Sequence, residues 1–500
     1  MLKATANSTL TNTSTFQLGF SRRLKAKFVT AMIYKAFKSP VRHIPGPFHT
    51  LITRLPLKYY IVTGQRLHYV HSLLRAYGPI VRISPHEIAT CDPDAFTSIH
   101  RIGSGFLKSP WYDTISSAPE PGIFMMRDPK EHAARRKLFA RAFSKNALGK
   151  NWGSVIRAKV DKAVEQLKSE GKGKGEVDIL KWWTLMATDV IGHLSFGQSF
   201  NMLDIGRKTN YINVLESSLF GSGMRAELPL LHALARFIPI QSIQAIVNGD
   251  AYLQDYGRRA VSNLRRQSGN AANLFGTMLN SSIAGESDMQ DSLSDRSICL
   301  EAGNLIVAGS DTTAVTLTYL TWAVLKKPEL QLKLEAEVAT LNEDFEDADV
   351  ERLPLVAAVI EETLRLYGAA PGSLPRTVPS GGSTLAGYFI PEGYSIETQA
   401  YTLHRDPNIF ANPLQFDESR FLDSSPLTAT QKQVFSPFGA GSRVCIGVHL
   451  ARSELRLSAA AFFRKCRGAR LSGMMTDEMM EIENHFLIAP KAHVCNIVIP

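Results

Sequence analysis

The chain has 500 residues and a net charge of +10, with 44% hydrophobic and 20% charged residues. This composition excludes fibrous, collagen-like and wholly disordered proteins, and five cysteines are too few for a disulfide-rich secreted scaffold. Thirteen Lys and Arg residues but no acid precede Glu87, so the positive excess lies near the N-terminus. That distribution suits a membrane surface or a targeting peptide and argues against a nucleic-acid partner.

Residues 1–44 are predicted to form a basic leader in front of a body that spans residues 45–500. The segment Arg22–Lys38 has no uncharged run long enough to cross a bilayer. Its apolar residues fall on one helical stripe, which indicates an interfacial helix. A transit peptide, a weak signal-anchor and a solvated terminus are the alternatives. The stiff run Ile44–Pro47 ends the leader.

Apolar residues at helical spacing predict helices over most of the body. These are Tyr69–Tyr77, Lys130–Phe143, Trp152–Ser169, Leu180–Phe196, Asp250–Gln267, a long helix from Ser294-Asp295 to just before Pro328, Leu353–Leu366 and Ile446–Ala459. Short strands are predicted at Ile80–Ile83, Tyr388–Ile390 and His493–Ile499, a Gly/Lys loop at Gly171–Gly175 and a mobile polar connection at Ser268–Asp291. No linker divides the body, so we expect one mainly α domain with a minor β part.

The first motif with chemical potential pairs His132 with Arg136 on the predicted helix before Phe143. The two residues are four apart, so their side chains share one face of the helix. Such a pair could hold a carboxylate. A solvated basic helix face is the simpler interpretation when this motif is taken alone.

The second motif is Ala308–Thr313 in the middle of the long apolar helix. An acid beside an alcohol is costly to bury there without partners. One hypothesis is that Gly309 loosens the helix and that Asp311 and Thr312 handle protons at a local widening. The other is that the serine and the acid cap a second helix at a break.

The third motif places Glu362 and Arg365 on one face of the helix Leu353–Leu366. An E-x-x-R pair arises once or twice by chance in a chain of this length, and a surface ion pair would contribute little stability. The pair lies about 80 residues before Cys445, and the irregular stretch between them could supply Arg420 as a third partner. This position makes a functional pair more credible than the spacing alone does.

The fourth and most specific motif runs from Phe438 to Gly447 with the spacing F-x-x-G-x-x-x-C-x-G. This spacing would occur by chance in about one in a thousand chains of this composition. Its glycines would let the backbone approach a flat ligand, and amides at the next helix start would stabilise a Cys445 thiolate. Arg443 adds a cation two residues away. The alternative, a structural cysteine in a turn, does not explain the spacing.

These motifs occur in an order that resembles cytochrome P450 from about Pro45 to the end of the chain. Fungal P450s that tailor secondary metabolites look most similar, because the chain has a Pro-Gly-Pro hinge, a His-Arg-Asp-Pro stretch at His404–Pro407 and Phe-Leu-x-Ala-Pro-Lys at Phe486–Lys491. The resemblance implies the cytochrome P450 fold, in which a single large helical domain with small β-sheets surrounds a buried haem.

The resemblance also implies which residues bind the cofactor. Cys445 would be the thiolate ligand of the iron of haem b, an arrangement that favours O–O cleavage, and Phe438 would pack beside the ligand loop. The residues expected to bind the haem propionates are Arg443, His132, Arg136 and Arg376.

Two further sets of residues gain roles from the resemblance. Asp311 and Thr312 would deliver protons to dioxygen at the haem. Glu362, Arg365 and Arg420 would form a structural ion network, which would cost about 3–5 kcal/mol if one buried partner were removed.

The implied activity is that of a monooxygenase that inserts one oxygen atom from O2 into a small apolar secondary metabolite, by hydroxylation or epoxidation. Electrons would come from NADPH through a separate NADPH–cytochrome P450 reductase, with cytochrome b5 as a further donor. The same haem could serve a desaturase, an oxidative ring rearrangement or a peroxide-driven isomerase. A haem sensor or carrier without catalysis is the hypothesis from another class.

The family places substrate contacts in segments that correspond here to Gly103–Phe124, Phe220–Leu231, the region near Ile306, Ala370–Leu374 and the region near Phe486. These segments are rich in apolar residues, which is typical of a site for an apolar substrate. The expected location is the cytosolic face of the endoplasmic reticulum membrane, as a peripheral protein, with mitochondria and cytosol as alternatives.

Overall fold

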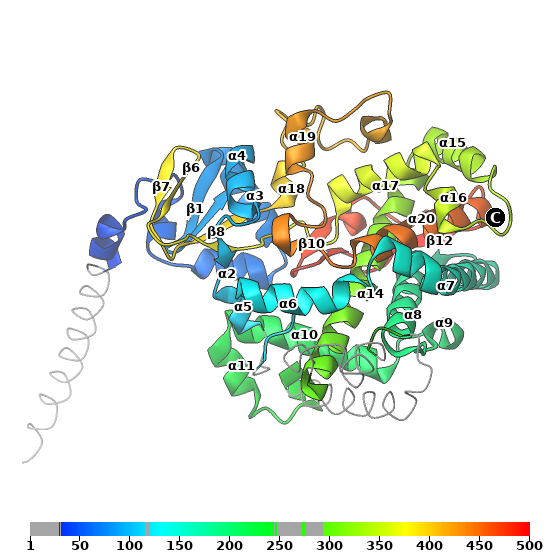
Figure 1. Cartoon of the computed structure of the whole chain (residues 1–500), viewed down its shortest axis with the longest axis horizontal. Coiled ribbons are helices and arrows are strands. Elements are labelled where there is room, and N and C mark those ends of the chain that lie inside the picture. The colour runs from blue at the N-terminus through cyan, green and yellow to red at the C-terminus, as the bar shows by residue number, and fades with distance from the viewer. Residues whose placement is uncertain are drawn as a thin grey trace, which may run out of the picture.

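A computed structural model describes residues 30, 32–115, 120–241, 243–244, 246–247, 273–275 and 294–500 of the chain. Helices gather at one end of the molecule and most strands at the other (Figure 1). The helices are α2 (Leu55–Val62), α3 (Arg66–Tyr77), α4 (Pro93–His100), α5 (Trp111–Thr114), α6 (Pro129–Ala140), α7 (Lys145–Lys174), α8 (Ile179–Phe196), α9 (Met202–Ile205), α10 (Asn210–Glu227), α11 (Pro229–Ala235), α14 (Asp295–Leu325), α15 (Pro328–Val338), α16 (Asp347–Val350), α17 (Pro354–Tyr367), α18 (Ala400–Leu403), α19 (Ala429–Val434) and α20 (Val448–Lys465).

The strands form small sheets. They are β1 (Ile80–Ser84), β2 (Glu87–Thr90), β3 (Leu107–Lys108), β4 (Val177–Asp178), β5 (Arg376–Thr377), β6 (Ser383–Leu385), β7 (Tyr388–Ile390), β8 (Ser395–Thr398), β9 (Arg470–Leu471), β10 (Ile482–Asn484), β11 (Ile488–Pro490) and β12 (Asn496–Val498). The main sheet has the order β1-β2-β8-β5-β3, with β2 and β8 parallel and its other pairs antiparallel. A three-stranded sheet has the order β4-β12-β9, and β6-β7 and β10-β11 are hairpins.

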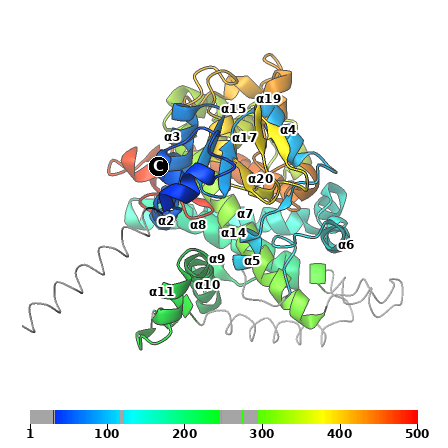
Figure 2. The same ribbon diagram turned by 90° about the vertical axis from the view of Figure 1, so that its left-hand side faces the viewer.

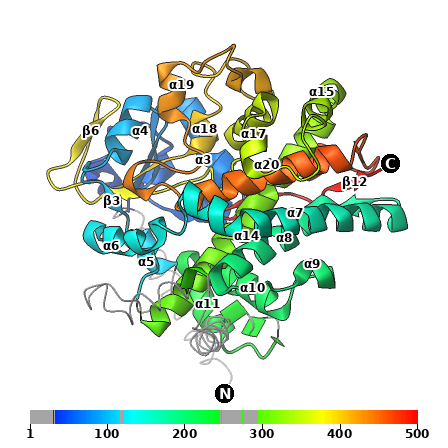
Figure 3. The same ribbon diagram turned by 45° about the vertical axis from the view of Figure 1, so that its right-hand side comes forward.

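The largest hydrophobic core surrounds the long helix α14. This helix packs against α8 on one side and against α17 and α20 on the other, while α7 packs against both α8 and α20 (Figure 3). Seen from the side of the main sheet, α14 descends from the centre of the molecule, below the strands, and α10 and α11 lie to one side of its lower part (Figure 2).

Most predicted elements are confirmed, with ends that differ by several residues. The confirmed helices are α3, α6, α7, α8, α14, α17 and α20, and the confirmed strands are β1, β7 and β12. The N-cap of α14 is Ser294, whose side chain accepts a hydrogen bond from the N–H of Ser297. The predicted helix Asp250–Gln267 lies outside the described residues, as does the connection Ser268–Asp291 apart from residues 273–275.

The predicted loop at Gly171–Gly175 is wrong. Helix α7 continues to Lys174 and ends at Gly175, which adopts the left-handed conformation with φ 82°. Gly171 is buried, and a Cβ there would lie 3.5 Å from Val177 and 3.7 Å from Ile499. These are ordinary contact distances, so this turn packs against β4 and the chain after β12 without a strict requirement for glycine.

A buried arginine attaches the start of the body to the main sheet. Arg82 in β1 donates hydrogen bonds to the carbonyls of Val41 and Ile44 at 3.0 and 2.7 Å and to the hydroxyl of Thr50 at 3.0 Å. Val41 and Ile44 are themselves buried, so tight packing begins a few residues before the predicted boundary at Pro45. Residues 32–38 are helical, and none of the helices described is long and apolar enough to span a bilayer.

Candidate active site

The cysteine of the F-x-x-G-x-x-x-C-x-G motif lies in a loop just before α20. The Cys445 N–H donates to the Phe438 carbonyl at 2.9 Å, and a short 3-10 helix, Gly441–Arg443, forms the bend between them. Gly441 has φ 65°, and a Cβ there would lie 1.9 Å from the carbonyl oxygen of His100. Only glycine fits this position, because the loop passes so close to the end of α4.

The Cys445 thiol lies in a recess of the protein. Its side chain is accessible, yet burial by the surrounding atoms raises its pKa. The backbone N–H of Gly447 and the guanidinium of Arg136 act in the opposite direction and lower that pKa. Arg136 also donates to the Val444 carbonyl at 2.8 Å, so α6 is fixed directly to the loop. Burial has the larger effect on this pKa, so the Gly447 N–H and Arg136 are the groups that would stabilise a thiolate here.

Five basic side chains gather beside this loop. They are Lys108 in β3, His132 and Arg136 in α6, Arg376 in β5 and Arg443 in the 3-10 helix. Burial and the neighbouring cations lower the pKa of His132 to about 3, that of Arg443 to about 10 and that of Lys108 well below its ordinary value. Within the described ranges, no carboxylate lies at ion-pair distance from any of the five.

Such a cluster is unfavourable unless an anion binds to it. Lys108 lies directly opposite Arg376 in the β3–β5 pair, and like charges at opposed positions are destabilising. The buried hydroxyl of Tyr112 lies beside Arg376 and Arg443, yet no group in the described chain gives it a well-formed hydrogen bond. These residues fit a flat group that carries two carboxylates and presents a metal to Cys445, as haem does.

Lys108 is the member of the cluster that the sequence does not predict. It stands alone between Leu107 and Ser109, with no spacing that marks it. Only the pairing of β3 with β5 brings it beside Arg376. Its Nζ lies 4.2 Å from the ring centre of Tyr112 and 4.3 Å from that of Phe124, so cation–π contacts hold it in place.

Asp311 and Thr312 lie on α14, which is unbroken, so the interpretation as a cap between two helices is wrong. The Thr312 hydroxyl donates to the Ala308 carbonyl at 2.7 Å. Burial and the nearby Glu216 raise the pKa of Asp311 to about 6, while Lys208 lowers it. A carboxyl with such a pKa exchanges protons near neutral pH.

The expected loosening of α14 at Gly309 does not appear in the structure. A Cβ on Gly309 would lie 2.9 Å from the side chain of Ile191 in α8. The glycine therefore has a packing role, because it allows α8 and α14 to approach closely where Thr312 follows on the next turn.

A buried glutamate in α20 was not predicted from the sequence. Glu454 accepts a hydrogen bond from the Thr313 hydroxyl at 2.9 Å and thereby joins the helix after Cys445 to the helix that carries Thr312. Burial raises its pKa to about 8, and Thr313 lowers it. No sequence pattern identifies this residue, because its environment arises from the packing of α14 on α20.

We predict that Glu454→Gln alters the pH dependence of stability. The folded-state pKa of about 8 exceeds the ordinary value of 4.5, so between these values the folded protein binds one more proton than the unfolded chain. The free energy of unfolding of the parent protein therefore falls as pH rises through that window. Glutamine keeps the acceptor for Thr313 and does not titrate. The difference in the free energy of unfolding, variant minus parent, should therefore be more positive at pH 9 than at pH 5. Guanidinium chloride denaturation at both pH values measures this, with the exposed Glu329→Gln as control.

Glu362, Arg365 and Arg420 come together as a buried ion network. The Glu362 carboxylate and the Arg365 guanidinium form two hydrogen bonds of 2.7 Å, and both side chains are fully buried. Arg365 also donates to the carbonyls of His404 and Pro413, and Arg420 lies 3.5 Å from Glu362. This set fixes α17 to the irregular segment before the cysteine loop.

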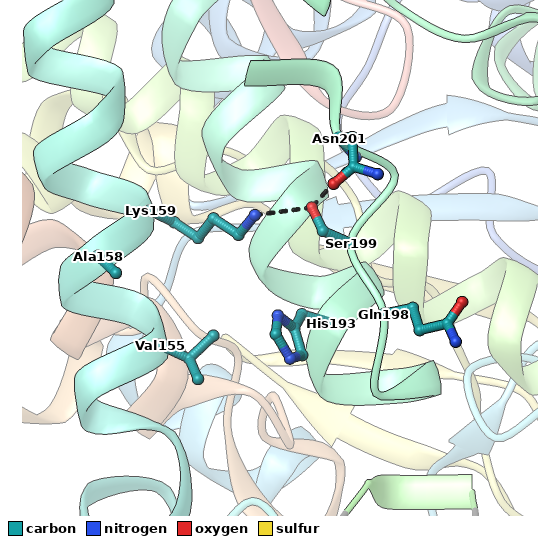
Figure 4. Close-up of a pocket in the computed structure, with 7 residues that line it drawn as sticks. All are labelled: Val155, Ala158, Lys159, His193, Gln198, Ser199 and Asn201. Carbon is teal, nitrogen blue, oxygen red and sulfur yellow. Dashed lines mark hydrogen bonds between the residues drawn. The ribbon is translucent and has the colours of Figure 1, made fainter. Parts of the chain in front are cut away.

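A surface hollow of about 440 Å³ lies elsewhere, between α7, α8 and the chain that follows α8 (Figure 4). The Lys159 ammonium donates to the Ser199 hydroxyl at 2.9 Å there and lies 3.9 Å from Asp189. The residues of the predicted site do not line this hollow. Lys159 already has partners there, and His193 of α8 is the other titratable residue of the lining.

Comparison with known proteins agrees with this geometry. The family profile for cytochrome P450 matches residues 45–496. Cytochrome P450 monooxygenase stcB of Emericella nidulans is 43% identical over 485 residues, which cover 94% of this chain and 91% of the relative. Cytochrome P450 monooxygenase tazI of Aspergillus terreus is 41% identical over 94% of this chain and 96% of its own. Averantin hydroxylase of Dothistroma septosporum is 29% identical over 86% and 81%.

Among solved structures, the heme domain of cytochrome P450DA superposes with a TM-score of 0.73 over 91% of this chain and 96% of that chain, at 20% identity. The likeness shows the fold. Together with the family profile and the relatives from fungi, it confirms the predicted mainly α fold and the predicted enzyme class. The chain belongs to the cytochrome P450 family and is a monooxygenase of the kind found among fungal secondary-metabolite enzymes, with a haem-thiolate cofactor.

Proposed function

We propose that this enzyme inserts one oxygen atom of O2 into a small apolar secondary metabolite, with electrons from NADPH delivered by a separate NADPH–cytochrome P450 reductase. The observation that carries the proposal is the cluster of five basic side chains beside Cys445 without a carboxylate partner in the described ranges. When bound, haem b would activate dioxygen, one atom of which enters the product. The reduced, carbon monoxide difference spectrum tests the thiolate, and ¹⁸O₂ labelling of the product tests the reaction.

Cys445 would bind the haem iron through its thiolate. The Gly447 N–H and Arg136 stabilise the negative sulfur, because both lower its pKa. Lys108, His132, Arg136, Arg376 and Arg443 bind the two haem propionates. Phe438 packs beside the loop, where its ring centre lies 5.5 Å from the guanidinium of Arg452. Binding of the propionates removes the like-charge repulsion across the β3–β5 pair.

On α14, Asp311 and Thr312 would hold and pass on the protons that the reduction of dioxygen requires. Asp311 has a pKa of about 6, so it can both accept a proton from solvent and pass it on. The Thr312 hydroxyl, whose proton is held by the Ala308 carbonyl at 2.7 Å, can rotate to donate to the reacting oxygen instead. The chain's own contribution to catalysis is thus positioned proton delivery.

We predict that Thr312→Ala uncouples the enzyme. The haem spectrum should persist, because Thr312 is not a ligand, while product formed per NADPH consumed falls at least about tenfold and hydrogen peroxide accumulates. A compound that shifts the haem spectrum on binding serves as the substrate. Thr316→Ala is the matched control, since the Thr316 hydroxyl makes the same kind of bond to the Thr312 carbonyl at 2.8 Å. If the ratio of product formed to NADPH consumed is unchanged in Thr312→Ala, Thr312 does not deliver protons in this reaction.

The substrate is proposed to lie against an aromatic wall. The ring centres of Phe124 and Phe486 are 5.6 Å apart, and those of Trp111 and Phe486 are 6.3 Å apart. Two segments expected to contact substrate, far apart in the sequence, therefore meet. Such a wall suits a rigid apolar molecule. The name of averantin hydroxylase favours hydroxylation over epoxidation as the reaction.

The reductase, with cytochrome b5 as a further donor, is proposed to dock on the outer face of α6. This helix turns His132 and Arg136 inward, while Lys130, Lys137 and Arg141 near it are exposed. An exposed basic face suits an acidic electron donor. Because α6 contacts the cysteine loop through Arg136, a donor bound there would lie near the thiolate.

Residues 1–44 are proposed to attach the enzyme to the cytosolic face of the endoplasmic reticulum membrane, ahead of a haem-thiolate domain at 45–500. Ile33, Tyr34 and Phe37 are exposed apolar side chains of this segment, and the segment is basic. Exposed aromatic residues beside cations suit an anionic lipid surface.

A further inference from the structure

Residues 120–127 form a strap that crosses from α14 to the cysteine loop. At one end, the Ser297 hydroxyl donates to Glu120 at 2.6 Å and the Ile123 N–H donates to Glu301 at 2.8 Å. At the other end, Arg443 donates to the carbonyls of Met126 and Arg127 at 2.8 and 3.1 Å. The strap therefore bridges α14, which carries the proposed proton-delivering pair, and the loop that carries Cys445.

The middle of the strap forms part of the aromatic wall. Phe124 packs edge-on against Tyr112 and Phe486, with ring centres 5.5 and 5.6 Å away. The Lys108 ammonium donates to the Phe124 carbonyl. A shift of the strap would therefore move Phe124 and change the width of the space beside it.

Glu301 holds the α14 end of the strap. Its side chain is fully buried, and one carboxylate oxygen accepts both from the Ile123 N–H and from the Arg135 guanidinium, each at 2.8 Å. Arg135 precedes Arg136 in α6, so this single carboxylate connects α14, the strap and the helix that binds the cysteine loop. Burial raises its pKa, and Arg135 and Ile123 lower it.

The strap also lies so close to α14 that a side chain at Gly122 would force the Asn304 amide to move. A Cβ at this position would lie 2.2 Å from the Asn304 amide and 3.4 Å from Glu301. Glu301 is about 16 Å along the helix from Thr312, at 1.5 Å per residue, so it is remote from the proton-delivering pair. Its contacts therefore act on the strap that carries Phe124 of the aromatic wall, and not on proton delivery.

We propose that Glu301 is a positioning residue that sets substrate specificity by clamping the strap against α14. The proposal rests on the proposed function, because it takes the aromatic wall to be the substrate wall. Without the carboxylate, the Ile123 N–H and the Arg135 guanidinium lose their shared acceptor, so this contact no longer holds the strap and α6 to α14. The aromatic wall is then no longer held in one position, so bulky molecules bind more weakly, while small molecules bind as before.

Hydrogen exchange of the strap tests the clamp directly, in the full-length protein as purified. In Glu301→Ala, amides of the peptide covering residues 120–127 should exchange at least about tenfold faster than in the parent protein. Glu301→Gln keeps an acceptor for the Ile123 N–H and loses the ion pair, so its strap amides should exchange at a rate between those of the parent protein and Glu301→Ala. If Glu301→Ala does not fold, the exchange rate of Glu301→Gln decides the question. Parent-like exchange in both variants overturns the proposal.

Glu335→Ala is the matched control. Glu335 is also a buried helical glutamate that accepts from a loop N–H, that of Gly468, at 2.9 Å. Its loss should speed exchange around Gly468 and leave the strap unchanged. Faster exchange of the strap in this control would show general loosening and would contradict a specific clamp.

Spectral titration of the holoenzyme with imidazole and with 4-phenylimidazole tests specificity. In Glu301→Gln, the Kd for 4-phenylimidazole should rise about tenfold, while the Kd for imidazole stays within about twofold. An equal change for both azoles overturns the specificity role. If the parent protein binds no haem, the proposed function fails, whereas the exchange result still decides whether Glu301 clamps the strap.

Discussion

Replacing Cys445 with alanine is expected to abolish the strongly red-shifted Soret band of the reduced, carbon monoxide-bound protein. That band reports a thiolate on the haem iron, and Cys445 is the cysteine whose side chain is accessible in the recess beside the basic cluster. The variant keeps the five basic residues that are proposed to bind the propionates, so it can retain haem while losing the band and all oxygenation activity.

The control for this experiment is a second cysteine. Cys91 is buried in a hydrophobic cluster with Val70 and Phe96, and none of the five basic residues beside Cys445 affects the pKa of its thiol. Cys91→Ala should keep the band. A band typical of a neutral ligand in the parent protein would mean that Cys445 is protonated or displaced. Folded protein without haem would contradict the assignment of the whole site.

The second large effect is expected from Arg365→Ala, which should lower the free energy of unfolding by about 3–5 kcal/mol. The substitution leaves the Glu362 carboxylate buried without its 2.7 Å partner, and it removes donors from the carbonyls of His404 and Pro413. Arg420, at 3.5 Å, is too distant to replace both hydrogen bonds. Chemical denaturation of the holoenzyme measures the loss.

The chain offers a control with the same spacing. Arg352 and Asp349 are also three residues apart and form an ion pair, but the Arg352 side chain is 73% exposed, whereas that of Arg365 is fully buried. Arg352→Ala should therefore cost at most about 1 kcal/mol. Similar losses in the two variants would mean that the buried network has no special structural role.

The elements predicted best are those whose signals are local. The apolar spacing of α8 and α17 and the Ser294 cap of α14 lie within each element, so they could be read along the chain. The Gly171–Gly175 segment shows the limit of such signals. Three glycines and two lysines favour a loop locally, but the segment is helical to Lys174, with Gly171 buried against Val177 and Ile499.

The sequence by itself determined the family and the position of Cys445, because one cysteine loop carries its glycines and its thiol within ten residues. Only the tertiary structure decided that Lys108 joins the basic cluster, that Glu454 is buried against Thr313 and that Glu301 holds the strap. Each of these three is a single charged residue without a motif. Its role depends on the pairing of β3 with β5 or on the packing around α14, and such contacts between distant segments leave no pattern in the sequence near the residue.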